Sequence, residues 1–370
     1  MKITDIRTQR VLMGDGTAKN PRSAFVRIEV EGGQFGLGEV SPMHGGLASL
    51  GIVDRELRPP LIGADIFDHA VLVDTLFHRV IKLGPQGAAT AALAAIDIAL
   101  WDLKGKLLGL PVHTLLGGAW RKEFDFYASI GGNAKKTVDA VVRDVARRVE
   151  NEAPVAVKIR LDGDRTRADA DIAGDLEKAR AVRKLLGDDF TIAFDANNAY
   201  SPGGALRVGH ALADLGYSWF EEPVQHYDVR SMGELAQRLP ITVSAGEQSY
   251  LLQELAMLIE SGVRMIQPDI IKMGGITGMM RAAALAYAHG VEFCPHQTQP
   301  SIGHYANMSV LSATMHITRP VELADNWQRG FPVFLNAARP EGGKLRLAEG
   351  PGLGAVIDEA EWENRLERAD

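Results

Sequence analysis

The order of hydrophobic and polar positions changes twice along the chain. Apolar and polar residues alternate over 2–13 and 23–40, and the second stretch contains a Gly-Gly pair, so the pattern predicts an antiparallel meander. Apolar residues then recur at helical spacing over 66–110, and this pattern stops at Gly109 with Pro111 close behind. The sequence therefore predicts an α+β domain over residues 1–115.

From residue 116 onward, short β-rich runs alternate with stretches of helical pattern. The eight runs are "FDFYASI", "PVAVKIRL", "FTIAFDANN", "YSWFEEPV", "ITVSAGEQ", "RMIQPDIIKM", "VEFCPHQ" and "RPVELADN". Alternation of this kind favours parallel βα units, and eight such units are typical of a TIM barrel of roughly 250 residues. A doubly wound open sheet is the competing α/β fold, but its Gly-rich nucleotide fingerprint is missing after the first run. We expect a (β/α) barrel over 116–335.

Composition narrows the class of protein without specifying its chemistry. The chain has 370 residues and a formal net charge of −7, which gives no basic footprint for nucleic acid. No run reaches the roughly 18 apolar residues of a membrane span, and the N-terminus lacks the apolar core of a signal peptide. The single cysteine, Cys294, cannot form an intrachain disulfide. We expect a soluble cytoplasmic protein that binds neither nucleic acid nor membranes.

A charged residue stands at or near the end of six successive β-rich runs, at steps of 22 to 27 residues, which is about one βα unit. In a barrel the carboxyl ends of the strands converge on one mouth, where such enzymes keep their chemistry. We therefore expect these side chains to meet: Asp195, Glu221, Glu247, Asp269, His296 and Glu322.

Three of these residues form a candidate metal site. Asp195, Glu221 and Glu247 would repel one another unless a cation lies among them, and carboxylate oxygens suit Mg²⁺. The alternative is that each acid only caps the helix after its strand. Of the two glutamates in "FEEP", the register favours Glu221 as the one that faces the mouth, because strand side chains alternate.

The second strand of the barrel carries two cations two residues apart. Lys158 and Arg160 share one face of the run "PVAVKIRL". If that face points inward, both can hold an anionic substrate and stabilise charge that develops on it. A solvent-exposed basic pair is the alternative interpretation.

Asp269 and His296 end neighbouring strands and suggest an acid–base pair, because a carboxylate bonded to an imidazole fixes its tautomer and raises its basicity. Glu322 has two open interpretations, a protonated hydrogen-bond donor or a salt-bridge partner of Lys158. Gln297, just after His296, either reads a substrate hydroxyl or caps the following helix. A metal, cations and such a dyad together suit removal of the proton next to a carboxylate.

These motifs resemble the enolase superfamily, in its mandelate racemase subgroup, over nearly the whole chain. "AIDIALWDLKGKLLGLPVHTLLGG", "DANNAY", "FEEPV", "AGEQ", "PDIIKMGGITG" and "PH" match in order and spacing. The resemblance implies a capping domain over 1–115, to which residues 336–370 return. It implies one Mg²⁺ per active site on Asp195, Glu221 and Glu247, a catalytic Asp269–His296 dyad and Glu322 as electrophilic acid.

The resemblance also implies how substrate is selected. Asn197 is a candidate substrate contact, and the capping loops near 15–22 and 42–52 would cover the mouth, with Arg22 and His44 as candidates. Relatives commonly assemble as homo-oligomers, so we expect one here.

One position departs from the pattern of many family members, which carry a second lysine where this chain has Arg160. Guanidinium stays protonated and is a poor base, so racemisation by two opposed bases is disfavoured. We therefore predict a hydro-lyase that removes water from an aldonate or aldarate with His296 as the single base. Open alternatives are Lys158 as base, a racemase, epimerase or cycloisomerase, and a non-catalytic binder of sugar acids.

Overall fold

A computed structural model describes residues 1–17, 22–161, 163 and 166–367. The N-terminal part contains an antiparallel sheet in the order β1-β2-β3, made of β1 (Ile3–Leu12), β2 (Arg22–Val30) and β3 (Phe35–Glu39). The helices that follow are α1 (Leu47–Ile52), α2 (Arg58–Leu61), α3 (His69–Val80), α4 (Ala88–Leu108) and α5 (Val112–Leu115). The predicted helical region is thus broken between α3 and α4, where Gly84 and Gly87 adopt positive φ.

The long helix α4 packs directly against β3 because two glycines of the strand allow it. A Cβ on Gly36 would lie 2.1 Å from the carbonyl oxygen of Ala99, and one on Gly38 would lie 1.8 Å from that of Ala95. The helix ends as predicted at Gly109, which takes the left-handed conformation that glycine adopts readily. Strand and helix therefore form one tightly packed unit, and most of α4 is buried.

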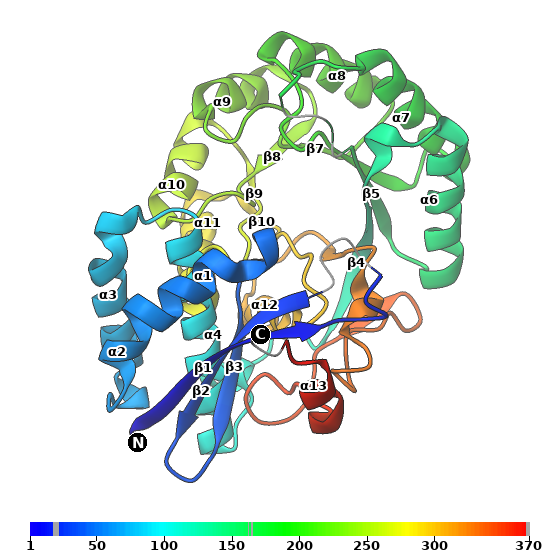
Figure 1. Cartoon of the computed structure of the whole chain (residues 1–370). Helices are drawn as coiled ribbons and strands as arrows, with labels where there is room; N and C mark the ends of the chain where they lie inside the picture. Colours follow the sequence, from blue (N-terminus) through cyan, green and yellow to red (C-terminus); the bar gives the residue numbers. More distant parts are fainter. Residues whose placement is uncertain (18–21, 162, 164–165, 368–370) are drawn as a thin grey trace.

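All eight predicted parallel strands are present and form a rolled sheet in the order β10-β9-β8-β7-β6-β5-β4-β11 (Figure 1). They are β4 (Glu123–Ile130), β5 (Ala156–Arg160), β6 (Thr191–Asp195), β7 (Trp219–Glu221), β8 (Thr242–Ala245), β9 (Met265–Ile266), β10 (Glu292–Phe293) and β11 (Val321–Leu323). Within the described residues no ladder of hydrogen bonds joins β10 to β11. The predicted TIM-type barrel with an N-terminal cap is confirmed.

Helices lie outside the rolled sheet and connect its strands (Figure 1). They are α6 (Val138–Glu152), α7 (Ile172–Leu186), α8 (Pro202–Asp214), α9 (Val229–Arg238), α10 (Leu252–Ser261), α11 (Gly275–His289) and α12 (Ile302–Ala313). None of the helices in the described ranges is long and apolar enough to span a membrane.

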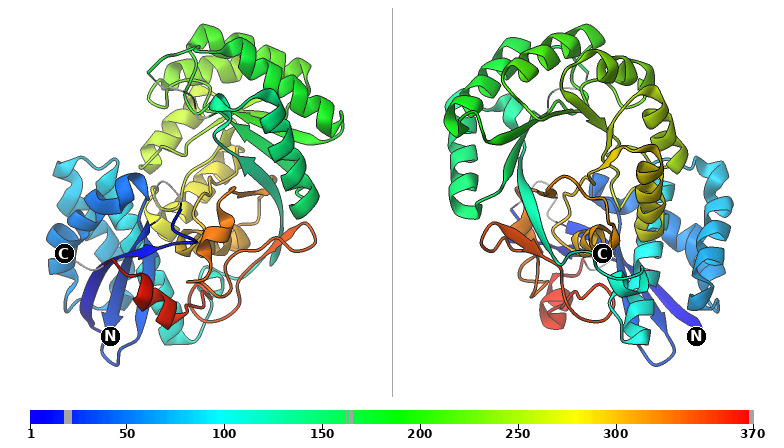
Figure 2. Two further views of the ribbon diagram at one scale, coloured as in Figure 1. Left: turned by 45° about the vertical axis from the view of Figure 1, so that its right-hand side comes forward. Right: turned by 180° about the vertical axis from the view of Figure 1, so that it is seen from behind.

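The C-terminal segment runs back to both parts of the fold. Strand β12 (Lys344–Arg346) pairs antiparallel with β4, and α13 (Glu359–Arg365) lies beside the N-terminal sheet (Figure 2). Trp362 packs against Phe25 of β2 with ring centroids 5.0 Å apart and the rings tilted by 50°, and Leu366 forms an antiparallel β-bridge with Val11. The predicted domain limits at 115 and 335 stay predictions.

One layer of side chains fills the barrel beneath the strand ends. It comprises Tyr127, Ala156, Ala193, Trp219, Met265 and Cys294, all buried. Four of these residues lie two positions before Lys158, Asp195, Glu221 and His296, so strand alternation places the polar residues on the same inner face one layer higher. This buried layer, called the floor below, thus lies directly under the charged strand ends.

We expect this floor to carry much of the barrel's stability. Trp219→Ala removes a fully buried ring that packs edge-on against Tyr127 at 5.4 Å, and it should lower the free energy of unfolding by about 3–5 kcal/mol. Trp120→Ala is the control, because Trp120 is 65% exposed, and it should cost less than about 0.5 kcal/mol. Urea unfolding followed by circular dichroism measures both, and equal losses would contradict the role of the floor.

Candidate active site

Three buried carboxylates converge at the ends of neighbouring strands. Asp195 of β6 pairs with Glu221 of β7, and Glu247 follows β8. One oxygen from each of the three lies within 4.8 Å of the others. Asp195 accepts a hydrogen bond from the backbone of Asn197 at 2.7 Å through Oδ1, whereas its buried Oδ2 has no hydrogen-bond partner among the described residues. This is the arrangement expected of a divalent cation site.

The acids of this cluster differ in how strongly burial and neighbouring charges disfavour their ionised forms. Burial and the nearby Glu221 raise the pKa of Asp195 well above its ordinary value. Outside the triad, burial and Glu247 raise the pKa of the adjoining Glu222 to about 8. Burial opposes ionisation of Glu247 too, but His296 and Lys272 outweigh it and lower that pKa to about 2. The side chains present thus leave negative charge incompletely compensated, and a hard cation fits the deficit.

Lys158 lies at the centre of the acidic cluster and is fully buried. Its ammonium contacts Glu221 at 2.8 Å, Glu322 at 3.0 Å and Asp195 at 3.8 Å. Burial favours the neutral amine, but the three carboxylates outweigh it and raise the pKa of Lys158 well above its ordinary value. Lys158 is therefore held as a cation, and its inward direction rules out a solvent-exposed pair with Arg160.

Asp269 and His296 form a hydrogen-bonded pair at the ends of β9 and β10. Nδ1 of His296 lies 2.9 Å from Oδ2 of Asp269, and the backbone N–H of Ile271 donates to Oδ1 of Asp269 at 3.0 Å. Nε2 of His296 lies 3.1 Å from Oε2 of Glu247. Burial opposes protonation of His296, but Glu247, Glu322 and Asp269 raise its pKa to about 9.

Glu322 is an ionised partner of Lys158. Its Oε2 accepts a hydrogen bond from the backbone N–H of Gln297 at 2.9 Å, and Oε1 faces the ammonium. Burial alone would favour the protonated acid, but Lys158 and His296 lower the pKa of Glu322 to about 2. Of the two interpretations left open by the sequence, the contacts favour the salt bridge.

A cavity of about 380 Å³ lies between the barrel mouth and the capping domain, beside this cluster of charged groups. Asp195, Glu221, Lys158 and Glu322 are not among its described lining residues. Its lining includes Arg160, Asn197, Glu247, Asp269 and His296 from the barrel. Most other lining groups are small or polar: Ser41, Pro42, Met43, Ser129, Lys272, Thr298, Gln299, Ala324, Asp325 and Asn326. A concave, polar site of this kind suits a small hydroxylated acid.

Three predicted substrate contacts do not border this cavity. His44 and Arg22 are not among the described lining residues, and Arg22 instead forms an ion pair with Glu367 at 3.3 Å. Gln297 is buried and donates from its amide to the backbone of Gln299 at 2.5 Å. Residues 18–21 of the first capping loop lie outside the described residues. The loop of 42–52 reaches the cavity through Pro42 and Met43, next to His44.

Two buried residues of the site, Lys272 and Gln267, are not predicted from the sequence. Lys272 reads as structural from its place beyond a strand, yet it lines the cavity, 3.8 Å from Asp269, and its ammonium donates to the backbone of Glu247 at 2.9 Å. Gln267 donates to Oε2 of Glu221 at 2.8 Å. The period-two rule offers a signal for Gln267, which precedes Asp269 by two positions.

The stretch "DANNAY" forms the bend that leads from β6 into the next loop. Asn197 and Asn198 both adopt positive φ, 48° and 68°, a conformation that asparagine tolerates better than most residues. The amide of Asn198 donates to Glu222, and Gln248 donates to the same carboxylate at 2.9 Å. Glu222 thus faces a neighbouring loop, and Glu221 is left as the inward member of "FEEP".

Comparison with known protein families matches both parts of the chain. Residues 2–117 match the mandelate racemase/muconate lactonizing enzyme N-terminal domain, and residues 140–361 match the enolase C-terminal domain-like family. Together the two matches cover most of the sequence.

Individual relatives extend this finding. A mandelate racemase/muconate lactonizing protein from Paracoccus denitrificans PD1222, solved in complex with magnesium, is 66% identical over 99% of this chain and 98% of its own, with a TM-score of 0.96. L-rhamnonate dehydratase of Saccharopolyspora erythraea is 31% identical, covering 90% of this chain and 82% of its own length. D-galactarolactone cycloisomerase of Agrobacterium fabrum is 30% identical over 97% of both.

We predict that the two glutamates of "FEEP" differ in their effect on metal binding. Glu221→Gln removes a charged oxygen from the triad and should weaken Mg²⁺ binding at least about tenfold. Glu222→Gln, the matched control, alters a carboxylate held by Asn198 and Gln248 and should retain most of the affinity. Isothermal titration calorimetry with Mg²⁺ measures both, and equal losses would refute the assignment of Glu221.

Proposed function

Because the chain belongs to the mandelate racemase/muconate lactonizing enzyme family of the enolase superfamily, we propose that it is a Mg²⁺-dependent acid-sugar dehydratase. The proposed reaction removes water from an aldonate or aldarate and gives a 2-keto-3-deoxy acid. The family chemistry begins with removal of the proton on the carbon next to the carboxylate.

The choice of dehydration rests on one observation. An acid–base group lies on one side of the cavity, and a cation that cannot act as a base lies on the other side. His296, which follows β10, is bonded to Asp269 through Nδ1 at 2.9 Å. Its Nε2 faces Glu247 at 3.1 Å and would serve a substrate once Glu247 binds the metal. Arg160, on β5, lines the same cavity, and β6 to β9 separate the two strands. Guanidinium does not accept protons, so the pair is poorly suited to opposed two-base chemistry.

Asp195, Glu221 and Glu247 would hold the metal. When bound, Mg²⁺ supplies positive charge that stabilises the enediolate form of the substrate. The buried Oδ2 of Asp195, which lacks a hydrogen bond within the described residues, supports this ligand set. Lys158 and Arg160 add fixed positive charge for the substrate carboxylate.

The steps assigned to the chain's own residues are two proton transfers at one imidazole. Nε2 of His296 takes the proton from C2 of the sugar acid, and Asp269 stabilises the imidazolium through Nδ1. The imidazolium then gives that proton to the hydroxyl on C3 as the C3–O bond breaks, so water leaves and an enol remains. Tautomerisation of the enol gives the 2-keto product.

The remaining polar residues would position the substrate. Asn197, Thr298 and Gln299 line the cavity with groups able to bond sugar hydroxyls. Glu322 would keep Lys158 in place through their 3.0 Å contact. Relatives named as dehydratases and as cycloisomerases both support acid-sugar chemistry, and an isomerase is the outcome that the test must separate.

We predict that a panel of aldonates and aldarates with Mg²⁺ contains a substrate that yields a 2-keto acid, detected by semicarbazide absorbance. His296→Asn should lower kcat at least about 100-fold, because the acid–base group is lost. Mass spectrometry of the same reactions reports whether water has been removed.

His113→Asn is the matched control for this variant. His113 is a buried histidine of α5 that does not line the cavity, and its replacement should leave kcat near wild type in folded protein. A product with the mass of the substrate would contradict dehydration and identify an isomerase.

A further inference from the structure

Two carboxylates of the capping domain reach across the domain interface and are almost completely buried. Asp97 belongs to α4 and Glu39 ends β3, and they are 0% and 1% exposed. Burying a carboxylate is costly unless it is well bonded. Burial raises the pKa of Glu39 to about 7, against hydrogen bonds that lower it. Both carboxylates bond to the starts of barrel helices, and each of these helices follows a loop that contains one residue of the dyad.

Asp97 caps barrel helix α11 from outside that helix. The backbone N–H of Thr277, in the first turn, donates to Oδ2 of Asp97 at 3.0 Å, and the Thr277 hydroxyl donates to Oδ1 at 2.5 Å. A Cβ on Gly275 would lie 2.5 Å from Oδ2, so the carboxylate occupies the space of that missing side chain. Two further side chains support this contact. Nε2 of His69 lies 2.8 Å from Oδ1 of Asp97, and the indole N–H of Trp101 donates to the hydroxyl of Thr277 at 3.0 Å.

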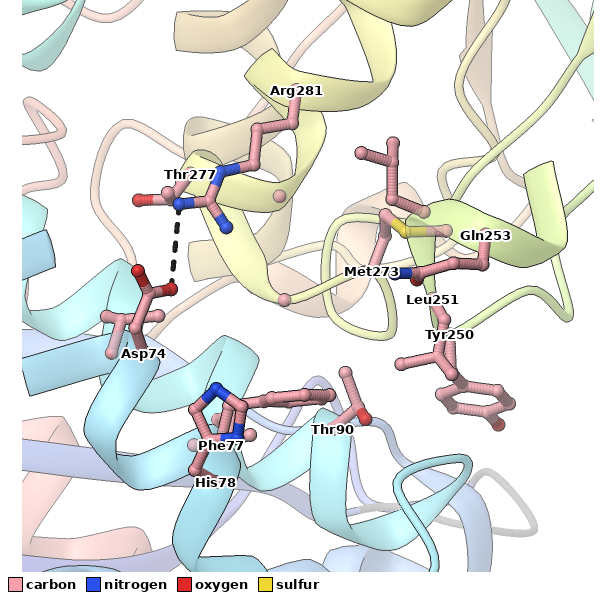
Figure 3. Close-up of a pocket in the computed structure, with 15 residues that line it drawn as sticks. Asp74, Phe77, His78, Thr90, Tyr250, Leu251, Gln253, Met273, Thr277 and Arg281 are labelled. Atoms are coloured by element: carbon pink, nitrogen blue, oxygen red, sulfur yellow. Dashed lines mark ion pairs between the residues drawn. The ribbon is translucent and has the colours of Figure 1, made fainter. Parts of the chain in front are cut away.

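This link borders a cleft of about 440 Å³ between α3 and α4 of the cap and α10 and α11 of the barrel (Figure 3). Thr277 lines the cleft, and Asp74 faces Arg281 across it at 3.6 Å. The two domains thus separate here, and Asp97 is a buried polar contact that joins them beside the cleft.

Glu39 plays the equivalent part at α12. Its Oε2 accepts the backbone N–H of Gly303, in the first turn, at 2.8 Å, and its Oε1 accepts the hydroxyl of Ser301 at 2.7 Å. An acceptor at the N-terminus of a helix satisfies free N–H groups and complements the helix dipole. Both barrel helices therefore begin on a carboxylate that the capping domain provides.

Each capped helix follows one member of the dyad through a short bonded loop. Asp269 precedes α11, and its backbone oxygen accepts the N–H groups of Lys272 and Met273 at 3.0 and 2.8 Å. His296 precedes α12, which starts six residues later. At Gly303 a Cβ would meet Gln299 at 3.0 Å and Ile271 at 3.2 Å, so the start of α12 also packs closely against the segment that follows Asp269.

We propose that Asp97 and Glu39 are positioning residues through which the capping domain fixes the geometry of the Asp269–His296 dyad. Loss of either cap would let one helix start, and the loop before it, shift relative to the other. Misplacement by about 1 Å is enough to cost up to about 100-fold in rate. The kinetic part of this inference rests on the proposed function, whereas the geometric part does not.

A matched control lies one turn further along α4. Asp102 is also buried and also joins separate parts of the chain, because it accepts the backbone N–H groups of Leu37 at 3.0 Å and Leu353 at 2.9 Å. These contacts lead to β3 and the C-terminal segment and not to a barrel helix. Asp102→Asn therefore reports what the loss of a buried bridging carboxylate does when that carboxylate bonds no barrel helix directly.

The test compares Asp97→Asn, Glu39→Gln and Asp102→Asn in ¹⁵N-histidine-labelled full-length protein. The downfield NMR resonance of the Nδ1 proton shared by His296 and Asp269 is assigned by its absence in His296→Asn. We expect this resonance to shift or broaden in the first two variants and to stay unchanged in Asp102→Asn. With a substrate from the panel, kcat should fall about 10- to 100-fold in the first two variants, and Mg²⁺ affinity should be retained.

Thr277→Val and Thr277→Ser keep the test informative if Asp97→Asn does not fold. Valine loses the hydroxyl that donates to Asp97 and should reproduce the shift, whereas serine keeps that donor and should restore the wild-type resonance. Lower melting temperatures with an unchanged resonance in the Asp97, Glu39 and Thr277→Val variants would overturn the proposal. Because the resonance is read without substrate, a panel that shows no turnover would count against the proposed function alone.

Discussion

The concentration of buried carboxylates at one end of the barrel is the constraint on which the structure depends. Asp195, Glu221 and Glu247 bring oxygens within 4.8 Å of one another, and Asp269 and Glu322 lie close by. Lys158, Lys272 and His296 compensate part of this charge, but the pKa of Asp195 remains well above its ordinary value because of burial and Glu221. A divalent cation fits what remains, and the cations that surround the cluster are then available to a substrate anion.

The regularity of parallel strands allows such a cluster to be assembled from distant residues. Side chains alternate along each strand, so the apolar layer that contains Trp219 lies directly beneath the layer that contains Glu221. The same geometry separates His296, which follows β10, from Arg160 on β5. The capping domain contributes more than a cover, because Asp97 and Glu39 bond the starts of the two helices that follow the dyad.

Much of this arrangement is predictable from the sequence because it follows local rules. The eight β-rich runs, the helix end at Gly109 and the regular spacing of the strand-end residues all depend on periodicity that is visible along the chain. Contacts set by distant segments are not visible in this way. Arg22 lies in a capping loop, and its ion pair with Glu367 at the other end of the chain cannot be read from its place in the sequence. Lys272 looks structural because it follows its strand, but the turn after Asp269 brings its ammonium back to the cavity.

The reaction proposed for this site is removal of the α-proton followed by loss of water from the same substrate. The most direct measurement is the reaction in D₂O of a sugar acid accepted by the wild-type protein, with product analysed by NMR and mass spectrometry. Single-base dehydration predicts a 2-keto product that has lost water and carries solvent deuterium at C3. A product of unchanged composition that carries deuterium at the α-carbon would contradict the account and would assign the site to racemisation or epimerisation.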